Sequence, residues 1–242
     1  MGLEVRDLAG LGEWSLASAL YRAVFGYTQP EFGISPRLLA ALQENSGSVI
    51  GAFDGSALVG FCYGFTAVDG GEIYHYSQAA AVAPRSQGQG VGRKLKVAQA
   101  AAARATGART MRWTFDPYAL RNAHFNLSVL GATAVRFLPD YYDDGASDRL
   151  LVSWDLTDPR SLPSRPSTGA PPVPPPQPPR AGISGSPDVV TARADHRRAA
   201  PTLAERARLR GALMARFQDG GVLVAVETSG DQAVYRFERA AK

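Results

Sequence analysis

The chain has 242 residues, of which 45% are apolar and 20% are charged, a composition typical of a globular protein. It holds no apolar run of about 18 residues and no basic N-terminal region followed by an apolar core, so we expect no membrane span, no signal peptide and a cytoplasmic location. Cys62 is the only cysteine, which excludes an internal disulfide and leaves a buried, inert thiol as the expected state.

The net charge of +4 is unevenly distributed along the chain. Residues 1–156 carry 13 basic and 14 acidic side chains, whereas residues 157–242 carry 13 basic and 8 acidic ones. A basic tail is a feature of some nucleic-acid binders, but these arginines are scattered and are not interleaved with aromatic residues. We therefore expect a solvated basic surface, with neither nucleic acid nor membrane as a partner.

Strands and helices alternate through the first 156 residues, which predicts a mixed α/β fold. Asp54-Gly55 between two apolar runs predicts a hairpin, and Ser35-Pro36 predicts the start of a helix. The elements are expected, in chain order, as a strand at 3–8, helices at 14–25 and 36–42, a hairpin of strands 48–53 and 57–61, a strand at 72–83, a helix at 92–105, a strand at 110–115, a helix at 122–130, and a strand pair at 134–138 and 150–154.

The composition changes near residue 157, and residues 159–187 contain 11 of the 17 prolines. Such a stretch favours extended polyproline conformation or disorder over a packed core. The predicted domains are an N-terminal domain at 1–156, a proline-rich linker at 157–201 and a C-terminal appendage at 202–242. We interpret the linker as a semi-rigid spacer, with a PxxP ligand at residues 172–175 as the alternative.

The appendage is predicted to contain a helix at 204–217 and a hairpin of strands 222–227 and 233–237. One helix and one hairpin are too little to fold alone. We therefore expect the appendage to dock on the main domain.

The segment Gln87-Gly88-Gln89-Gly90-Val91-Gly92 joins the end of a predicted strand to the start of a predicted helix. Glycine lets a ligand approach the backbone, and a helix start supplies unpaired N–H groups and the positive end of a dipole. This combination predicts a phosphate site, to which Arg93 and Lys94 add positive charge. The segment fits neither the dinucleotide fingerprint, which needs glycine at position 93, nor the Walker loop, which needs a glycine followed by lysine.

The same segment resembles the acyl-CoA loop of the GNAT acyltransferases, [Gln/Arg]-x-x-Gly-x-[Gly/Ala]. Gln87, Gly90 and Gly92 match its three fixed positions, and the order of elements over about residues 1–156 is similar to that of the family. The resemblance implies a GNAT fold. It also implies transfer of an acetyl or other acyl group from an acyl-CoA to an amine by direct attack, without a metal.

The resemblance further implies which residues bind the cosubstrate. In the family the loop amides hold the CoA diphosphate, and the pantetheine arm lies between two splayed strands. The cosubstrate-binding residues implied here are Ala81, Val82, Gln87, Gly88, Gln89, Gly90, Val91, Gly92, Arg93, Asn122 and Phe125. The segments 113–117, 121–126 and 130–132 look like a largely uncharacterised bacterial subgroup, some of whose relatives are linked with N-succinyl-amino-acid metabolism. That similarity suggests an amino-acid acceptor.

One position departs from the family pattern. Many members carry a tyrosine that protonates the departing thiolate, and Leu127 stands at that position here. The acid is therefore missing or supplied from elsewhere. A degenerate domain that binds CoA as a sensor or interaction module is the alternative to an active enzyme. We expect a small-molecule amine as the partner and leave a homodimer open.

Transfer to an amine needs a base for the amine proton and help for the departing thiolate. Asp116, His75 and Tyr142 are the candidate catalytic residues. Asp116 ends a strand that should border the acyl site, although Asp before Pro also commonly shapes a turn. His75 titrates near neutral pH, although a core histidine is the alternative.

Tyr142, or its neighbour Tyr141, could replace the missing acid, with aromatic packing at a substrate entrance as the alternative. His124 and Glu72 are further candidates, for which a surface location is the simpler interpretation.

Overall fold

The computed structural model describes residues 2–157, 188–193, 201–229 and 232–239. The proline-rich stretch of the predicted linker at 157–201 lies outside the described residues, so its role as a spacer stays a prediction. Within the described residues, no helix has both the length and the apolar character that crossing a bilayer requires.

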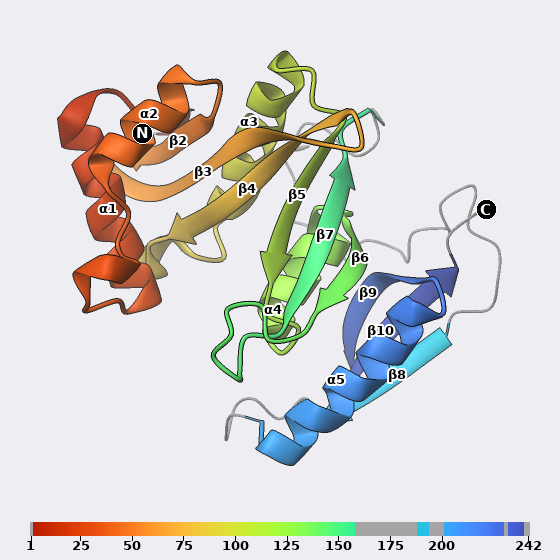
Figure 1. The fold of residues 1–242 in the computed structure, drawn as a ribbon. Helices are drawn as coiled ribbons and strands as arrows, with labels where there is room; N and C mark the ends of the chain where they lie inside the picture. Colours follow the sequence, from red (N-terminus) through yellow and green to blue (C-terminus); the bar gives the residue numbers. More distant parts are fainter. Residues whose placement is uncertain (1, 158–187, 194–200, 230–231, 240–242) are drawn as a thin grey trace. The chain divides into compact units, whose positions relative to one another are not determined.

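The described residues form two compact units, whose elements are labelled in Figure 1. The first unit contains residues 2–113 and 155–157. The second contains residues 114–154 and the described residues from 188 onward. The predicted main domain is therefore divided between the two units, and the C-terminal appendage belongs to the second.

The first unit combines a mixed sheet with helices. Its strands follow the order β1-β2-β3-β4-β5, antiparallel except for the parallel pair β4–β5. Its elements are β1 (Glu4–Asp7), α1 (Gly10–Phe25), η1 (Pro30–Phe32), α2 (Pro36–Glu44), β2 (Ser48–Asp54), β3 (Ala57–Asp69), β4 (Glu72–Val82), η2 (Pro84–Ser86), α3 (Val91–Ala105) and β5 (Thr110–Phe115), whose last two residues belong to the second unit.

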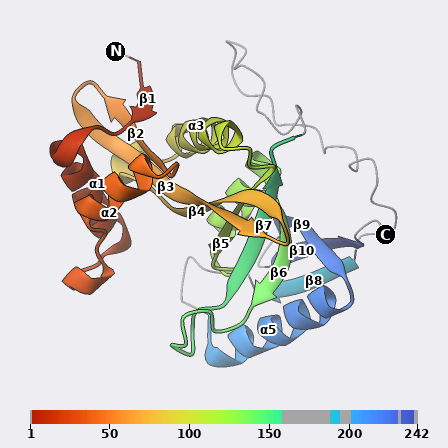
Figure 2. The same ribbon diagram turned by 45° about the horizontal axis from the view of Figure 1, so that its top comes forward.

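Both faces of this sheet are covered, because apolar residues occupy successive positions of β2 and β3 and successive side chains of a strand point to opposite faces. On one face, Val49 and Phe61 belong to a core with residues of α1 and α2. On the other face, Ile50 and Cys62 belong to a core with residues of α3. Figure 2 shows α3 across the sheet from α1 and α2.

The second unit contains an antiparallel sheet with the order β7-β6-β9-β10-β8. Its elements are α4 (Leu120–Ala123), the π-helical segment η3 (His124–Val129), β6 (Thr133–Leu138), β7 (Arg149–Asp155), β8 (Asp188–Arg193), α5 (Leu203–Gln218), β9 (Gly221–Ser229) and β10 (Gln232–Arg239). Within this unit the C-terminal hairpin extends the sheet beyond β6, because Leu223 of β9 pairs with Ala134.

Helix α5 is well specified by its sequence. Thr202 and Glu205 form a reciprocal capping box at its start, which satisfies backbone N–H groups that the helix leaves unpaired. Its side chains Leu209 and Leu213 are buried, and the ring of Phe217 meets that of Phe237 edge-on at 5.2 Å between centroids. The helix therefore buries its apolar side against the strands of the appendage.

The predicted mixed α/β class is confirmed, and so is the hairpin at Asp54-Gly55, which joins β2 to β3. Three details differ from the sequence analysis. Strand β3 runs to Asp69 and not only to residue 61, and the predicted helix at 122–130 is a single α-turn followed by η3. Strand β8 was not predicted and lies within the segment 157–201 that was expected to be a linker.

Candidate functional site

The glycine-rich loop joins β4 to α3 in the first unit, as the sequence predicted (Figure 1). The side-chain amide of Gln87 donates a 3.0 Å hydrogen bond to the carbonyl oxygen of Val82, which ties the loop to the end of the strand. Gly88 and Gly90 have φ angles of 77° and 78°, in the left-handed region that favours glycine. Gly90 is the N-cap residue of α3.

The start of α3 presents groups suited to an anion. The first N–H groups of a helix have no partner within it, and the helix dipole is positive there. A Cβ atom at Gly88 or Gly90 would meet no atom within 4 Å, so the space beside both glycines is open. The Nε of Arg93 is buried and has no hydrogen-bond partner among the described residues, so it is a donor that a bound phosphate could satisfy.

Strands β4 and β5 separate within the first unit. They pair only where Tyr74 to Tyr76 face Thr110 to Arg112, and β4 continues beyond this stretch to Val82. The register against β3 also shifts, because Tyr63 faces Ala79 and Gly64 faces Ser77. Gln78 is therefore an extra residue that forms a β-bulge, in the part of β4 that has no β5 partner.

The remaining residues implied by the resemblance divide between the units. Ala81 is buried and pairs with Phe61, whereas the Val82 carbonyl already accepts the Gln87 bond. Asn122 is exposed in α4 and Phe125 is half-buried in η3, both in the second unit.

His75 lies in a buried polar network of the first unit. Its side chain is only 1% exposed, Nε2 lies 2.8 Å from the Ser48 hydroxyl, and Nδ1 lies 3.5 Å from the Thr66 hydroxyl. Burial lowers the pKa of His75 to about 4, so the ring is neutral at pH 7. With both ring nitrogens occupied, His75 is placed to orient neighbours and not to meet a substrate directly.

The same network continues to a lysine that the sequence analysis did not single out. Gln99 donates to the Ser48 hydroxyl at 2.9 Å, and the Ser77 hydroxyl donates to Gln99 at 2.7 Å. The ammonium of Lys96 donates to the Ser77 hydroxyl at 2.7 Å and lies 4.0 Å from the centre of the Trp113 ring. Lys96 is 3% exposed, and burial lowers its pKa to about 8.

Gly64 makes room for this network. A Cβ atom at Gly64 would collide with the carbonyl oxygen of Tyr76 and lie 2.7 Å from His75 Nε2 and 3.0 Å from Gln99 Nε2. Spacing in the sequence gives no signal for such a network, because its members come from four elements.

Asp116 follows β5 in the second unit and is half-buried. One carboxylate oxygen accepts a 2.8 Å hydrogen bond from the Tyr118 N–H, which is the turn-forming contact expected for Asp before Pro. The Tyr118 hydroxyl donates to the carbonyl oxygen of Arg206 in α5 at 2.7 Å. The turn that carries Asp116 is thus fixed by the C-terminal appendage.

Tyr142 lies in the loop between β6 and β7, also in the second unit. It is 54% exposed, and its ring contacts Tyr141 edge-on at 4.9 Å between centroids. The loop folds on its own carboxylates: Asp140 accepts from the N–H groups of Asp144 and Gly145. Its last residue, the buried Asp148, pairs with Arg210 of α5 at 2.8 Å.

Leu127 lies in η3 and is buried, so this position of the second unit offers only hydrocarbon. Cys62 is also buried, and burial raises the pKa of its thiol to about 12, which agrees with an inert packing role. The described residues hold no group of three or more His, Cys, Asp and Glu side chains that could bind a metal. Glu72 and His124 are exposed.

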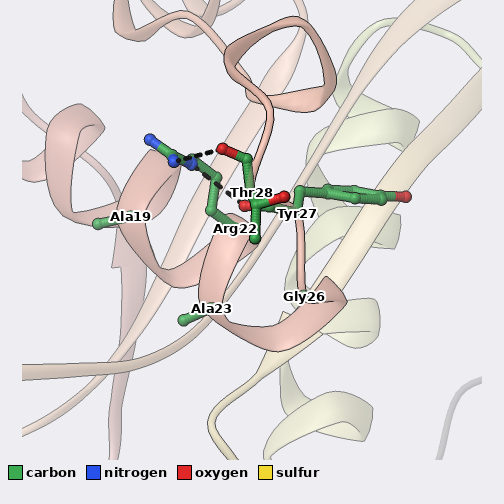
Figure 3. Close-up of a pocket in the computed structure, with 6 residues that line it drawn as sticks. All are labelled: Ala19, Arg22, Ala23, Gly26, Tyr27 and Thr28. Carbon is green, nitrogen blue, oxygen red and sulfur yellow. Dashed lines mark hydrogen bonds between the residues drawn. The ribbon is translucent and has the colours of Figure 1, made fainter.

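An open hollow of about 380 Å³ lies at the end of α1 (Figure 3). It is lined by Ala19, Arg22, Ala23, Gly26, Tyr27 and Thr28. The Arg22 guanidinium donates to the carbonyl oxygens of Tyr27 and Thr28, both at 3.4 Å, and so closes the loop that follows the helix.

Comparison with known proteins finds a family match over part of the chain. The model of the acetyltransferase (GNAT) family matches residues 14–131, whereas no curated protein matches the chain. Among solved structures, yncA from Salmonella typhimurium, solved with its cofactor acetyl-CoA, is 18% identical with a TM-score of 0.53, over 70% of this chain and 100% of that one.

Two further structures are similar. The ribosomal-protein-S18-alanine N-acetyltransferase from Escherichia coli is 18% identical with a TM-score of 0.51, over 65% of this chain and 96% of that one. An N-acetyltransferase from Staphylococcus aureus is 17% identical with a TM-score of 0.53, over 65% of this chain and 100% of that one. At these identities the likeness shows the fold, which is the GNAT fold predicted from the sequence.

Proposed function

The acetyltransferase (GNAT) family model matches residues 14–131, and from this premise we propose that the chain transfers an acyl group from an acyl-CoA to the amine of a small molecule by direct attack. As a GNAT-type N-acetyltransferase it would use acetyl-CoA or a related acyl-CoA. The amine acceptor, the route of attack and the residue roles below are parts of the proposal.

The observation that carries the proposal is the loop at the start of α3. Its exposed backbone turns through Gly88 and Gly90, and the space beside both glycines is open. A diphosphate fits there because the first N–H groups of the helix and the positive end of its dipole favour an anion, and the unpartnered Arg93 Nε belongs to the first turn of the same helix. Residues 87–93 would hold the diphosphate.

The length of the pantetheine arm then fixes its reach. The arm has about twelve backbone bonds, equal to roughly four residues of extended chain, or about 14 Å. If the arm leaves the loop at the end of β4, beside Val82, and lies back along the strand, four residues bring its end to Gln78, next to Ser77. This is the stretch where β4 has no β5 partner and bulges. Backbone groups of β4, including those of Ala81 and Val82, would bind its amides.

In the proposed reaction the amine nitrogen attacks the thioester carbonyl carbon and the carbon–sulfur bond breaks. We assign removal of the amine proton to Asp116, directly or through water, because a half-buried carboxylate at a strand end suits a base. Tyr142 is the phenol assigned to the substrate entrance. His75 is assigned as a positioning residue because its ring nitrogens are occupied. Asn122 and Phe125 are assigned to the cosubstrate.

The test is thiol release from acetyl-CoA and succinyl-CoA with a panel of amines that includes free amino acids. The proposal expects release that depends on the amine and an acylated product of the same amine by mass spectrometry. CoA binding without turnover on any amine would favour the second candidate, a CoA-binding sensor, which Leu127 at the usual acid position supports.

A further inference from the structure

The ammonium of Lys96 lies where strands β4 and β5 of the first unit stop pairing with each other. It donates to the Ser77 hydroxyl at 2.7 Å and lies 4.0 Å from the centre of the Trp113 ring. Ser77 and Trp113 are the first residues of β4 and β5 beyond their paired stretch, which ends at Tyr76 and Arg112. Lys96 therefore puts a positive charge where the pairing of β4 with β5 ends.

This charge has no counter-charge. Among the described residues, no carboxylate lies within ion-pair distance of Lys96, although its side chain is 3% exposed. The titratable groups that interact with it are Cys62 on β3 and His75 on β4, and both are neutral at pH 7 because burial shifts their pKa values to about 12 and about 4. A buried unpaired cation is costly, and such groups gather at functional sites.

The polar network holds the ammonium in place. Ser77 accepts from Lys96 and donates to Gln99, and Gln99 donates onward to Ser48. Because the Ser77 hydroxyl gives its proton to Gln99, its oxygen is free to accept from the ammonium, and this hydrogen bond fixes the position of the ammonium. The ammonium has three N–H donors, and only the one to Ser77 is used within the described residues.

We infer that Lys96 stabilises the departing thiolate, in place of the phenol that Leu127 cannot supply. The inference rests on the proposed function, because the reach of the pantetheine arm along β4 places the sulfur beside Gln78 and Ser77. When the amine nitrogen bonds to the carbonyl carbon, the electron pair of the carbon–sulfur bond leaves on sulfur. The amine proton passes to the base, and the thiolate is paired with the Lys96 ammonium.

The decisive measurement is the pKa of the thiol of bound CoA, followed by the ultraviolet absorbance of the thiolate. Wild-type protein should hold this pKa below that of free CoA, because a buried cation favours the anion. Lys96→Met should raise it to the free value or above. Lys96→Arg, which keeps the charge, should lie between the two. The same bound-thiol pKa in wild type and Lys96→Met would overturn the inference.

Desulfo-CoA is the matched control, because it keeps the diphosphate and the arm but lacks the sulfur. Lys96→Met should bind desulfo-CoA with unchanged affinity by calorimetry, which also reports a folded loop. Its kcat should fall about 100-fold with KM for acetyl-CoA nearly unchanged. If wild type binds neither CoA nor desulfo-CoA, the proposed function fails. If both bind and kcat is unaffected in Lys96→Met, only the assignment of Lys96 fails.

Discussion

The hydroxyl of Tyr235, near the C-terminus, donates a 3.0 Å hydrogen bond to the carbonyl oxygen of Pro117, the residue after Asp116. The bond is buried and joins positions 118 residues apart in the sequence. Two more contacts join the appendage to the same region, from Tyr118 to Arg206 and from Arg210 to Asp148. The appendage therefore braces the turn that carries Asp116 and the loop that carries Tyr142.

Tyr235→Phe should loosen the turn at Asp116. Removing the hydroxyl leaves the Pro117 carbonyl without this partner and should cost about 1 kcal/mol of unfolding free energy. We expect a larger effect on kcat than on CoA affinity, because the glycine-rich loop belongs to the other unit.

The matched control is Arg236→Gln on the same strand, which removes the exposed ion pair with Glu227. An exposed pair contributes little, so this variant should keep wild-type kcat and stability. Equal kcat in Tyr235→Phe and wild type would argue against the bracing role.

Gly90→Asp and Gly90→Asn separate charge from conformation in the phosphate loop. Asn and Asp tolerate the left-handed backbone that Gly90 adopts, and both can cap a helix, so the two variants should fold alike. Only Asp places a negative charge in the open space beside the helix start. Calorimetry should show CoA affinity at least about 10-fold weaker for Asp than for Asn, a difference of about 1.4 kcal/mol. Equal CoA affinities of the two variants would show that the diphosphate does not bind at this loop.

Asp116→Asn tests the proposed base without breaking its turn. The side-chain oxygen of Asn can still accept the Tyr118 N–H, so stability should stay near that of wild type. If the carboxylate takes the amine proton, kcat should fall about 100-fold or more on an identified substrate. If the carboxylate only binds an ammonium group of the substrate, KM should rise and kcat should change little. Wild-type kinetics would exclude both roles.

The features that the sequence predicted well are local. The loop at 87–92 is specified by glycine spacing between a strand and a helix, and the hairpin at Asp54-Gly55 by two residues. The start of α2 after Ser35 is also local, although the Ser35 side chain makes no capping hydrogen bond. Each of these depends on backbone geometry that neighbouring residues determine.

The features that the sequence did not predict depend on distant partners. In the sequence, Lys96 looks like an ordinary polar residue of a helix. Its role depends on Ser77 and Trp113, which the fold places beside it from two strands. Strand β8 exists through its pairing with β10, and strand propensity is set largely by such neighbours. His75 is another example, because its ring is buried and lies against Ser48 and Thr66, which other strands bring to it. The usual pKa of histidine, on which the prediction relied, carries no information about these partners.

The buried His75 should make stability depend on pH below neutrality. The pKa of His75 is about 4 in the folded protein and 6.5 ordinarily. Between these pH values the histidine is therefore protonated in the unfolded chain and neutral in the folded one. Stability is therefore full above about pH 6.5 and falls as the pH drops toward 4. From pH 7 to pH 5 this one group should remove about 2 kcal/mol of unfolding free energy.

His75→Gln should abolish that part of the pH dependence. Urea unfolding of wild type and variant at pH 7 and pH 5 gives the test, because the contributions of all other titrating groups cancel in the difference between the two proteins. Only the change with pH is informative, since losing the Ser48 contact lowers stability at every pH. His124→Gln, at an exposed position, is the control and should follow wild type at both pH values. The same fall for wild type and His75→Gln would show that His75 is protonated as readily in the folded chain as in the unfolded one.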